Sequence, residues 1–135
     1  MSRSPVVVVC ALLVLTLAAC GDGGGPSGSD GGPDPDARPV SEGRALFEQT
    51  CASCHGADLK GTTSGPPFLD PIYAPNHHPD EAFYAAVENG VQPHHWDFGP
   101  MPAQPGLSEQ EVAAIVAYVR SEQAEAGITE DPSHP

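Results

Sequence analysis

The alternation of apolar and polar positions is clearest near the end of the chain, over residues 108–120. Ser108 and Glu111 form the pattern of a capping box, in which each residue caps the other at a helix start. The apolar positions that follow recur at helical spacing, i, i+3, i+4 and i+7, and are Val112, Ile115, Val116 and Val119. This segment is therefore predicted to be an amphipathic helix with one buried face.

Two other segments also show helical patterns. One begins at Ser41, a favourable N-cap, and continues through Phe47 into a cysteine-containing motif. The other covers residues 80–89, after Pro79 and before Gly90, with apolar residues at helical spacing. The connections 56–78 and 91–107 are rich in Gly, Pro, His and Asn, and no segment shows sustained strand alternation. An all-α fold of three to four short helices with long loops is expected.

The N-terminal residues 1–19 have the pattern of an export signal, with a basic residue, an apolar run of about a dozen residues and small residues at its end. The stretch Leu17-Ala18-Ala19-Cys20 resembles the lipobox of bacterial lipoproteins. That resemblance implies that Cys20 carries lipid and anchors the chain to a membrane without spanning it. Residues 20–39 are rich in Gly and Pro and are expected to form a flexible tether, and 128–135 a short disordered tail.

The folded part is then residues 40–127, a short length for a core made from side chains alone. Its two long loops also need something to wrap around, because long loops without structure of their own are uncommon in compact domains. Both observations indicate a large apolar cofactor in the core.

The motif Cys51-Ala52-Ser53-Cys54-His55 is compatible with four kinds of site: a redox dithiol, half of a zinc site, a disulfide or a covalent haem attachment. A redox dithiol of the thioredoxin type needs a preceding strand, whereas here a helix precedes the motif. A zinc site needs four ligands, and no second cysteine pair is available once Cys10 is removed with the signal and Cys20 is lipidated. A disulfide leaves His55 unexplained. Haem attachment, with His55 on the iron, is the favoured interpretation.

Met101 is the only methionine that remains after removal of the signal, and it lies in the loop Gly99-Pro100-Met101-Pro102. A lone methionine is often a gap-filler in a core. In a rigid Pro-flanked loop before the last helix, it is a better candidate for the second axial ligand. A His/Met pair raises the iron potential and suits electron transfer.

These motifs, with the Gly-Pro-Pro-Phe-Leu stretch 65–69 and the helix 107–120, resemble the small monohaem class I c-type cytochromes of bacteria over roughly residues 40–127. The resemblance implies that Gly43 and Phe47 of the first helix meet the 115–118 face of the last. It also implies that a proline carbonyl, from Pro66 or Pro67, accepts the Nδ1–H of His55, and that one haem edge stays exposed.

Two histidine pairs, His77-His78 and His94-His95, leave three alternatives open. They can be ordinary loop histidines, a second metal site, or a replacement for Met101 on the iron. Trp96 is expected in the haem pocket or against a propionate, because its N–H needs a partner near an apolar face.

The chain carries 18 acidic and 5 basic residues, for a formal net charge of −13. This acidity argues against nucleic-acid binding and fits a redox partner with a basic docking patch, although it equally fits mere solubility. The expected function is a membrane-anchored, extracytoplasmic one-electron carrier without enzymatic activity of its own. The two alternatives are an electron-entry subunit of a dehydrogenase or oxidase, and a haem sensor or peroxidase-like site with a labile Met101.

Overall fold

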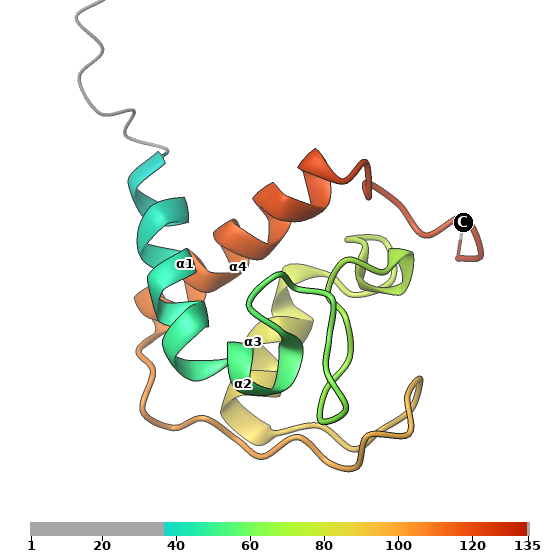
Figure 1. The fold of residues 1–135 in the computed structure, drawn as a ribbon, viewed down its shortest axis with the longest axis horizontal. Coiled ribbons are helices and arrows are strands. Elements are labelled where there is room, and N and C mark those ends of the chain that lie inside the picture. Colours follow the sequence, from blue (N-terminus) through green and yellow to red (C-terminus); the bar gives the residue numbers. More distant parts are fainter. Residues whose placement is uncertain (1–36, 135) are drawn as a thin grey trace, which may run out of the picture. The chain divides into compact units, whose positions relative to one another are not determined.

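The computed structural model describes residues 37–134, and its helices are α1 (Ala37–Thr50), α2 (Ala52–His55), α3 (Asp80–Asn89) and α4 (Glu109–Glu125). A 3-10 turn, η1 (Pro71–Tyr73), lies in the loop before α3. Over the described residues the only β pairing is an isolated antiparallel bridge between Val91 and Met101. The expected all-α architecture is confirmed, and Figure 1 shows α1 crossing α4 with α2, α3 and the loops beside them.

The crossing of α1 and α4 is possible because Gly43 has no side chain. A Cβ at this position would lie 1.8 Å from the carbonyl oxygen of Ala114, so the two backbones are in direct contact there. Phe47 packs next to this contact, fully buried, with its ring 5.6 Å from that of Tyr118. The first and last helices therefore meet at the residues that the family resemblance implied.

The core around this crossing is small. The buried apolar side chains that pack together in one cluster are Phe47, Leu59, Ile115, Tyr118 and Val119. Phe68 joins it from the long loop, at 6.1 Å from the ring of Phe47 and 5.5 Å from that of Phe83. So few buried residues match the expectation that side chains alone do not fill this domain.

Two of the predicted helix starts are found where the sequence places them. Ser108 accepts a hydrogen bond from the Glu111 N–H while the Glu111 carboxylate accepts one from the Ser108 N–H, which completes the capping box of α4. Helix α3 covers residues 80–89 as predicted, with Pro79 before it and Gly90 after it at φ 73°.

The start of α1 differs from the prediction. The helix begins at Ala37, so Ser41 lies inside it and is not the N-cap, and the last residues of the predicted tether are helical. Pro39 is compatible with this start because it lies in the first turn, where a missing N–H breaks no intrahelical hydrogen bond.

The prediction of a disordered tail at 128–135 is wrong for the described residues up to 134. Asp131 is only 5 % exposed. The Asn76 side chain donates to the carbonyls of Asp131 and His134 and accepts from the Asp131 N–H, at 2.6–3.0 Å. The tail is polar and was expected to stay in solvent, but these specific hydrogen bonds fix it against the loop before α3.

Candidate functional site

The cysteine motif forms the junction between α1 and α2. The N–H groups of Cys54 and His55 donate to the Cys51 carbonyl at 3.1 and 3.0 Å, so the motif makes one helical turn. Burial raises the pKa of Cys51 to about 11, with a smaller contribution from Cys54. A redox-active dithiol needs the opposite shift, toward the thiolate. The environment of Cys51 therefore disfavours the redox interpretation.

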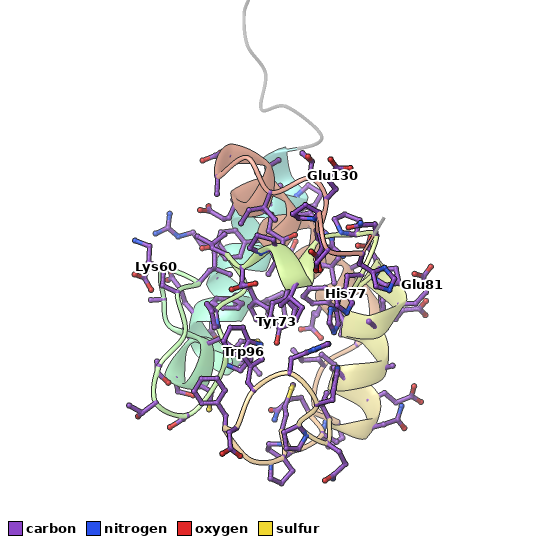
Figure 2. All side chains as sticks on the ribbon, turned by 90° about the vertical axis from the view of Figure 1, so that its right-hand side faces the viewer. Lys60, Tyr73, His77, Glu81, Trp96 and Glu130 are labelled. Carbon is purple, nitrogen blue, oxygen red and sulfur yellow. The ribbon has the colours of Figure 1, made fainter. Side chains whose placement is uncertain are left out.

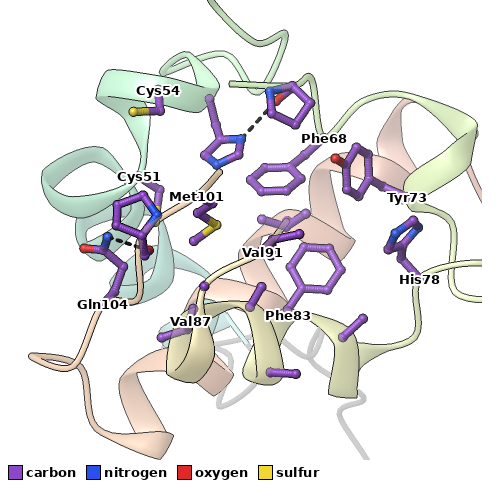
Figure 3. Close-up of a pocket in the computed structure, with 18 of the residues that line it drawn as sticks. Cys51, Cys54, Phe68, Tyr73, His78, Phe83, Val87, Val91, Met101 and Gln104 are labelled. Atoms are coloured by element: carbon purple, nitrogen blue, oxygen red, sulfur yellow. Dashed lines mark hydrogen bonds between the residues drawn. The ribbon is translucent and has the colours of Figure 1, made fainter. Parts of the chain in front are cut away.

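His55 is held in one orientation by its two neighbours. It is 8 % exposed, and its Nδ1 lies 3.0 Å from the Pro66 carbonyl, an acceptor that requires the proton on this nitrogen (dashed line in Figure 3). The Phe68 ring stacks on the imidazole at 4.3 Å and 18°. Burial lowers the pKa of His55 against the opposing effect of the Pro66 hydrogen bond. The neutral ring thus keeps its Nε2 lone pair available to coordinate a metal ion.

The structure also resolves which proline accepts this bond. It is Pro66, and Pro67 makes no such contact with His55. Gly65 brings the loop this close, because a Cβ there would lie 2.8 Å from the Cys54 carbonyl oxygen. The Thr62 hydroxyl donates to that same carbonyl at 2.6 Å and ties the loop to α2.

Met101 is fixed by its backbone. Its N–H and carbonyl exchange hydrogen bonds with Val91 at 2.9 and 3.0 Å. Gly90 permits this approach, because a Cβ there would lie 2.5 Å from the Met101 carbonyl oxygen. The side chain of Met101 lines the same cavity as Cys51 and His55.

That cavity has a volume of about 650 Å³ and is lined by residues of α1, α2, α3, α4 and the loops between them. In Figure 3, Cys51 and Cys54 lie at one end, Tyr73 and His78 lie at the other, and Phe83 and Val87 enter from α3. Cavities of this size usually bind a small molecule or a cofactor. The described residues therefore combine a large, mainly apolar space with two thiols and two candidate iron ligands.

Trp96 tests whether a haem fits this cavity. Its indole Nε1 is buried without a hydrogen-bond partner among the described residues, which is costly for a polar group. Burial raises the pKa of the nearby Tyr73 to about 12, against a smaller lowering by the indole of Trp96. The Tyr73 hydroxyl makes no hydrogen bond of normal geometry with that indole. A haem supplies carboxylates that can accept from this N–H. The orphaned donor therefore fits the group that the cysteine motif would attach.

The two histidine pairs come together in space. His78, His94 and His95 line one end of the cavity, whereas His77 lies outside its lining and faces the C-terminal tail. The rings of His77 and His95 are 4.9 Å apart, although α3 separates them in the sequence.

Two residues that position the site were not identified from the sequence. Arg120 donates to the carbonyls of Tyr73 and His78, to Gln123 and to Asp80. Gln123 is 1 % exposed and donates to the Phe68 carbonyl at 2.8 Å. The sequence showed only that a charged residue and an amide residue lie near the apolar face of α4. This pattern does not identify a positioning role, because surface helices carry such residues routinely.

The predicted lipidation residue, Cys20, and the export signal lie outside the described residues. Within 37–134, no helix has the length and apolar character needed to cross a membrane.

Comparisons with known proteins agree with this geometry. Residues 40–123 match the protein family described as Cytochrome c. The chain is 32 % identical over 123 residues to "Cytochrome c-551" of Bacillus subtilis, covering 90 % of this chain and 97 % of that protein.

Other relatives are parts of larger proteins. The chain is 33 % identical over 88 residues to "Cbb3-type cytochrome c oxidase subunit CcoP" of Rhodobacter capsulatus, covering 61 % of this chain but 29 % of that subunit. It is 34 % identical over 85 residues to "Cbb3-type cytochrome c oxidase subunit FixP" of Rhizobium meliloti, covering 61 % of this chain and 27 % of that subunit. No solved structure matches the chain. With the family matching over most of the described domain, and with a thiol pair, an adjacent histidine and a cavity in place, the chain belongs to the cytochrome c family and binds haem c covalently.

Proposed function

We propose that this chain is a membrane-anchored, extracytoplasmic carrier of single electrons that uses one haem c. The bound haem supplies the one-electron iron couple. Cys51 and Cys54 provide the thioether anchors, and His55 and Met101 provide the axial ligands. With both axial positions filled, no coordination site is left for a substrate, so the chain itself catalyses no bond chemistry.

The observation that carries this proposal is the clamped position of Met101. Its N–H and its carbonyl are both hydrogen-bonded to Val91, and its side chain lines the cavity that His55 also lines. A sensor or a peroxidase-like site needs a ligand that leaves the iron readily. A methionine on a pinned backbone is instead suited to a closed site with little rearrangement between the two oxidation states.

The remaining cavity residues have supporting roles. Pro66 holds the His55 tautomer and increases the basicity of the ring. Phe68 blocks rotation of the imidazole by stacking on it. Trp96 is proposed to donate its unpaired N–H to a haem propionate, which would remove the cost of burying that group.

The ferric spectrum of the exported, haem-loaded protein tests the closed site. A far-red methionine–iron charge-transfer band is expected, and it should vanish in Met101→Ala. A high-spin wild type that binds azide or carbon monoxide readily would refute the closed site and favour the sensor or peroxidase interpretation.

The second candidate function is an electron-entry subunit of a larger oxidase or dehydrogenase. It is favoured by the relatives named as oxidase subunits, of which this chain spans about a quarter to a third. Purification from the native membrane distinguishes the two. A carrier should be recovered mainly alone and reduce a separate acceptor, whereas a subunit should remain with a larger complex through size-exclusion chromatography.

The membrane anchor is a separate part of the proposal. It rests on the lipobox-like stretch before Cys20, and an acidic domain on a Gly/Pro-rich tether would then face redox partners that carry a basic patch. Mass spectrometry of the mature N-terminus should find Cys20 with acyl groups. Release of Cys20→Ala into the soluble fraction is expected, and an unmodified Cys20 in the wild type would exclude the anchor.

A further inference from the structure

Five imidazoles gather at the end of the cavity near Tyr73. His77 and His78 come from the loop before α3, His94 and His95 from the loop after it, and His134 from the C-terminal tail. Ring centroids are 4.8 Å apart for His77 and His78, 5.2 Å for His78 and His95, and 4.6 Å for His77 and His134. Three separate segments of the chain therefore deliver histidines to one place.

Three members of this cluster have the geometry of a metal site. Potential ligand atoms of His77, His78 and His95 all lie within 4.8 Å of one another. Nitrogens bound to one tetrahedral Zn²⁺ at 2.0–2.1 Å are about 3.3 Å apart. Small side-chain rotations can bring the candidate ligand atoms from this separation to that of bound nitrogens, and the exposed His95 is free to rotate.

The backbone and Asp131 orient the rings as metal sites require. His77 Nδ1 lies 2.7 Å from the Asp131 carboxylate, and His78 Nδ1 lies 2.6 Å from the Ile72 carbonyl. Asp131 is in turn held by the N–H and hydroxyl of Ser133 at 2.8 and 2.7 Å. A histidine that binds a metal usually donates its second N–H to such an acceptor, which leaves Nε2 for the ion.

Haem binding accounts for only part of this arrangement, because His78 and His95 line the haem cavity but His77 does not. The cysteine motif and Met101 already supply the anchors and the candidate ligands. Crowding imidazoles is also unfavourable when they are protonated. Burial and the neighbouring histidines lower the pKa of His78 and His95, in the direction that favours the neutral, coordinating ring.

We propose that His77, His78 and His95 bind one divalent transition-metal ion at the rim of the haem cavity. The ion is of the class that prefers imidazole, Zn²⁺ or Cu²⁺, and a fourth position stays open to water or to a side chain of a partner. Asp131 is a positioning residue, since it orients His77 and fixes the tail over the site.

The proposal is tested on the exported, haem-loaded protein by isothermal titration with zinc chloride and, separately, with copper sulfate. One ion per chain is expected. His77→Gln and His95→Gln should each weaken binding by at least about 100-fold. Asp131→Asn should weaken it by roughly 10- to 100-fold, the usual effect of losing such an outer acceptor.

His94→Gln is the matched control, because His94 belongs to the same cluster but not to the three-ligand set. Its affinity should stay within about threefold of the wild type. Far-UV circular dichroism and the Soret band must be unchanged in every variant, so that unfolding is not mistaken for loss of a ligand. In the copper-loaded protein, electron paramagnetic resonance should show nitrogen hyperfine structure that decreases in His95→Gln.

Two results would overturn the proposal. One is the absence of stoichiometric binding of either ion. The other is binding that persists unchanged in His77→Gln and His95→Gln, which would locate the ion elsewhere, for example on surface carboxylates. If one ion binds at the three histidines, elemental analysis of the protein purified from its native membrane decides between zinc and copper.

Discussion

Replacing Arg120 with methionine should reveal how much of the loop that carries the site depends on one side chain. The guanidinium donates to the Tyr73 carbonyl at 2.7 Å, to the Gln123 amide oxygen at 2.7 Å and to the His78 carbonyl, and it pairs with Asp80 at 2.8 Å. It also stacks 4.9 Å above the Phe83 ring. Methionine keeps the aliphatic bulk of the side chain and removes every donor.

The loss of stability in Arg120→Met depends on which of the four acceptors water can hydrate once the guanidinium is removed. Asp80 is 56 % exposed, so its ion pair contributes well under 1 kcal/mol. The two carbonyls and the Gln123 oxygen are part-buried, and each loses a charge-assisted bond worth roughly 1–1.5 kcal/mol after partial rehydration. The sum is about 3–4.5 kcal/mol. For a domain of this size, that corresponds to roughly 12–36 °C in the melting temperature.

The assay is guanidinium and thermal unfolding of the haem-loaded protein, followed by far-UV circular dichroism and Soret absorption. Arg44→Met is the matched control, because Arg44 only pairs with Glu48 on the exposed face of α1, with side chains 63 % and 45 % exposed. It should leave the unfolding midpoint nearly unchanged, because an exposed ion pair contributes little to stability. Equal effects of Arg120→Met and Arg44→Met would refute the reasoning that Arg120 organises the loop.

Three further predictions concern packing, capping and pH. Gly43→Ala should destabilise the domain by at least about 2 kcal/mol in chemical unfolding, because its Cβ would overlap Ala114, while Gly106→Ala, with no atom within 4 Å, should be nearly neutral. Ser108→Ala should cost about 1 kcal/mol in the same assay through loss of the capping box, and a neutral result would contradict the cap assignment. Hydrogen bonds from His77 and Ser133 lower the pKa of Asp131 to about 2, so its stabilisation of the tail is complete above its ordinary pKa near 4 and is lost as pH falls through 2. The protection factors of the Asp131, Ser133 and His134 amides, which correct the exchange rates for their intrinsic pH dependence, should therefore fall as pH falls over that range, and should stay constant there in Asp131→Asn.

The parts of the fold that could be predicted are those with short-range patterns. The capping box at Ser108 and the Pro79 and Gly90 boundaries of α3 each depend on residues within a few positions of one another. The start of α1 was misplaced because Ser41 has the right chemistry for an N-cap, yet the preceding residues are also compatible with a helix. Local propensity cannot decide between two acceptable starts.

The candidate site shows the same division. The cysteine motif and Met101 were identifiable because their residue types are rare and their context is specific. Arg120, Gln123 and Asp131 were not, because each acts through partners 40 or more positions away, such as Asp80 for Arg120 and Asn76 for Asp131. A sequence pattern does not state which distant carbonyl an exposed-looking arginine will reach.

The bridge between Val91 and Met101 also has a consequence for how this protein can diverge. It closes residues 92–100 into a loop whose two ends are pinned to each other, and this loop carries His94, His95 and Trp96. Figure 2 shows Trp96 below Tyr73 on the side away from the tail. Substitutions, and even changes of length, within the loop can alter the surface at the rim while the methionine keeps its place. The position of Met101 and the surface that the loop 92–100 presents can therefore change independently during evolution.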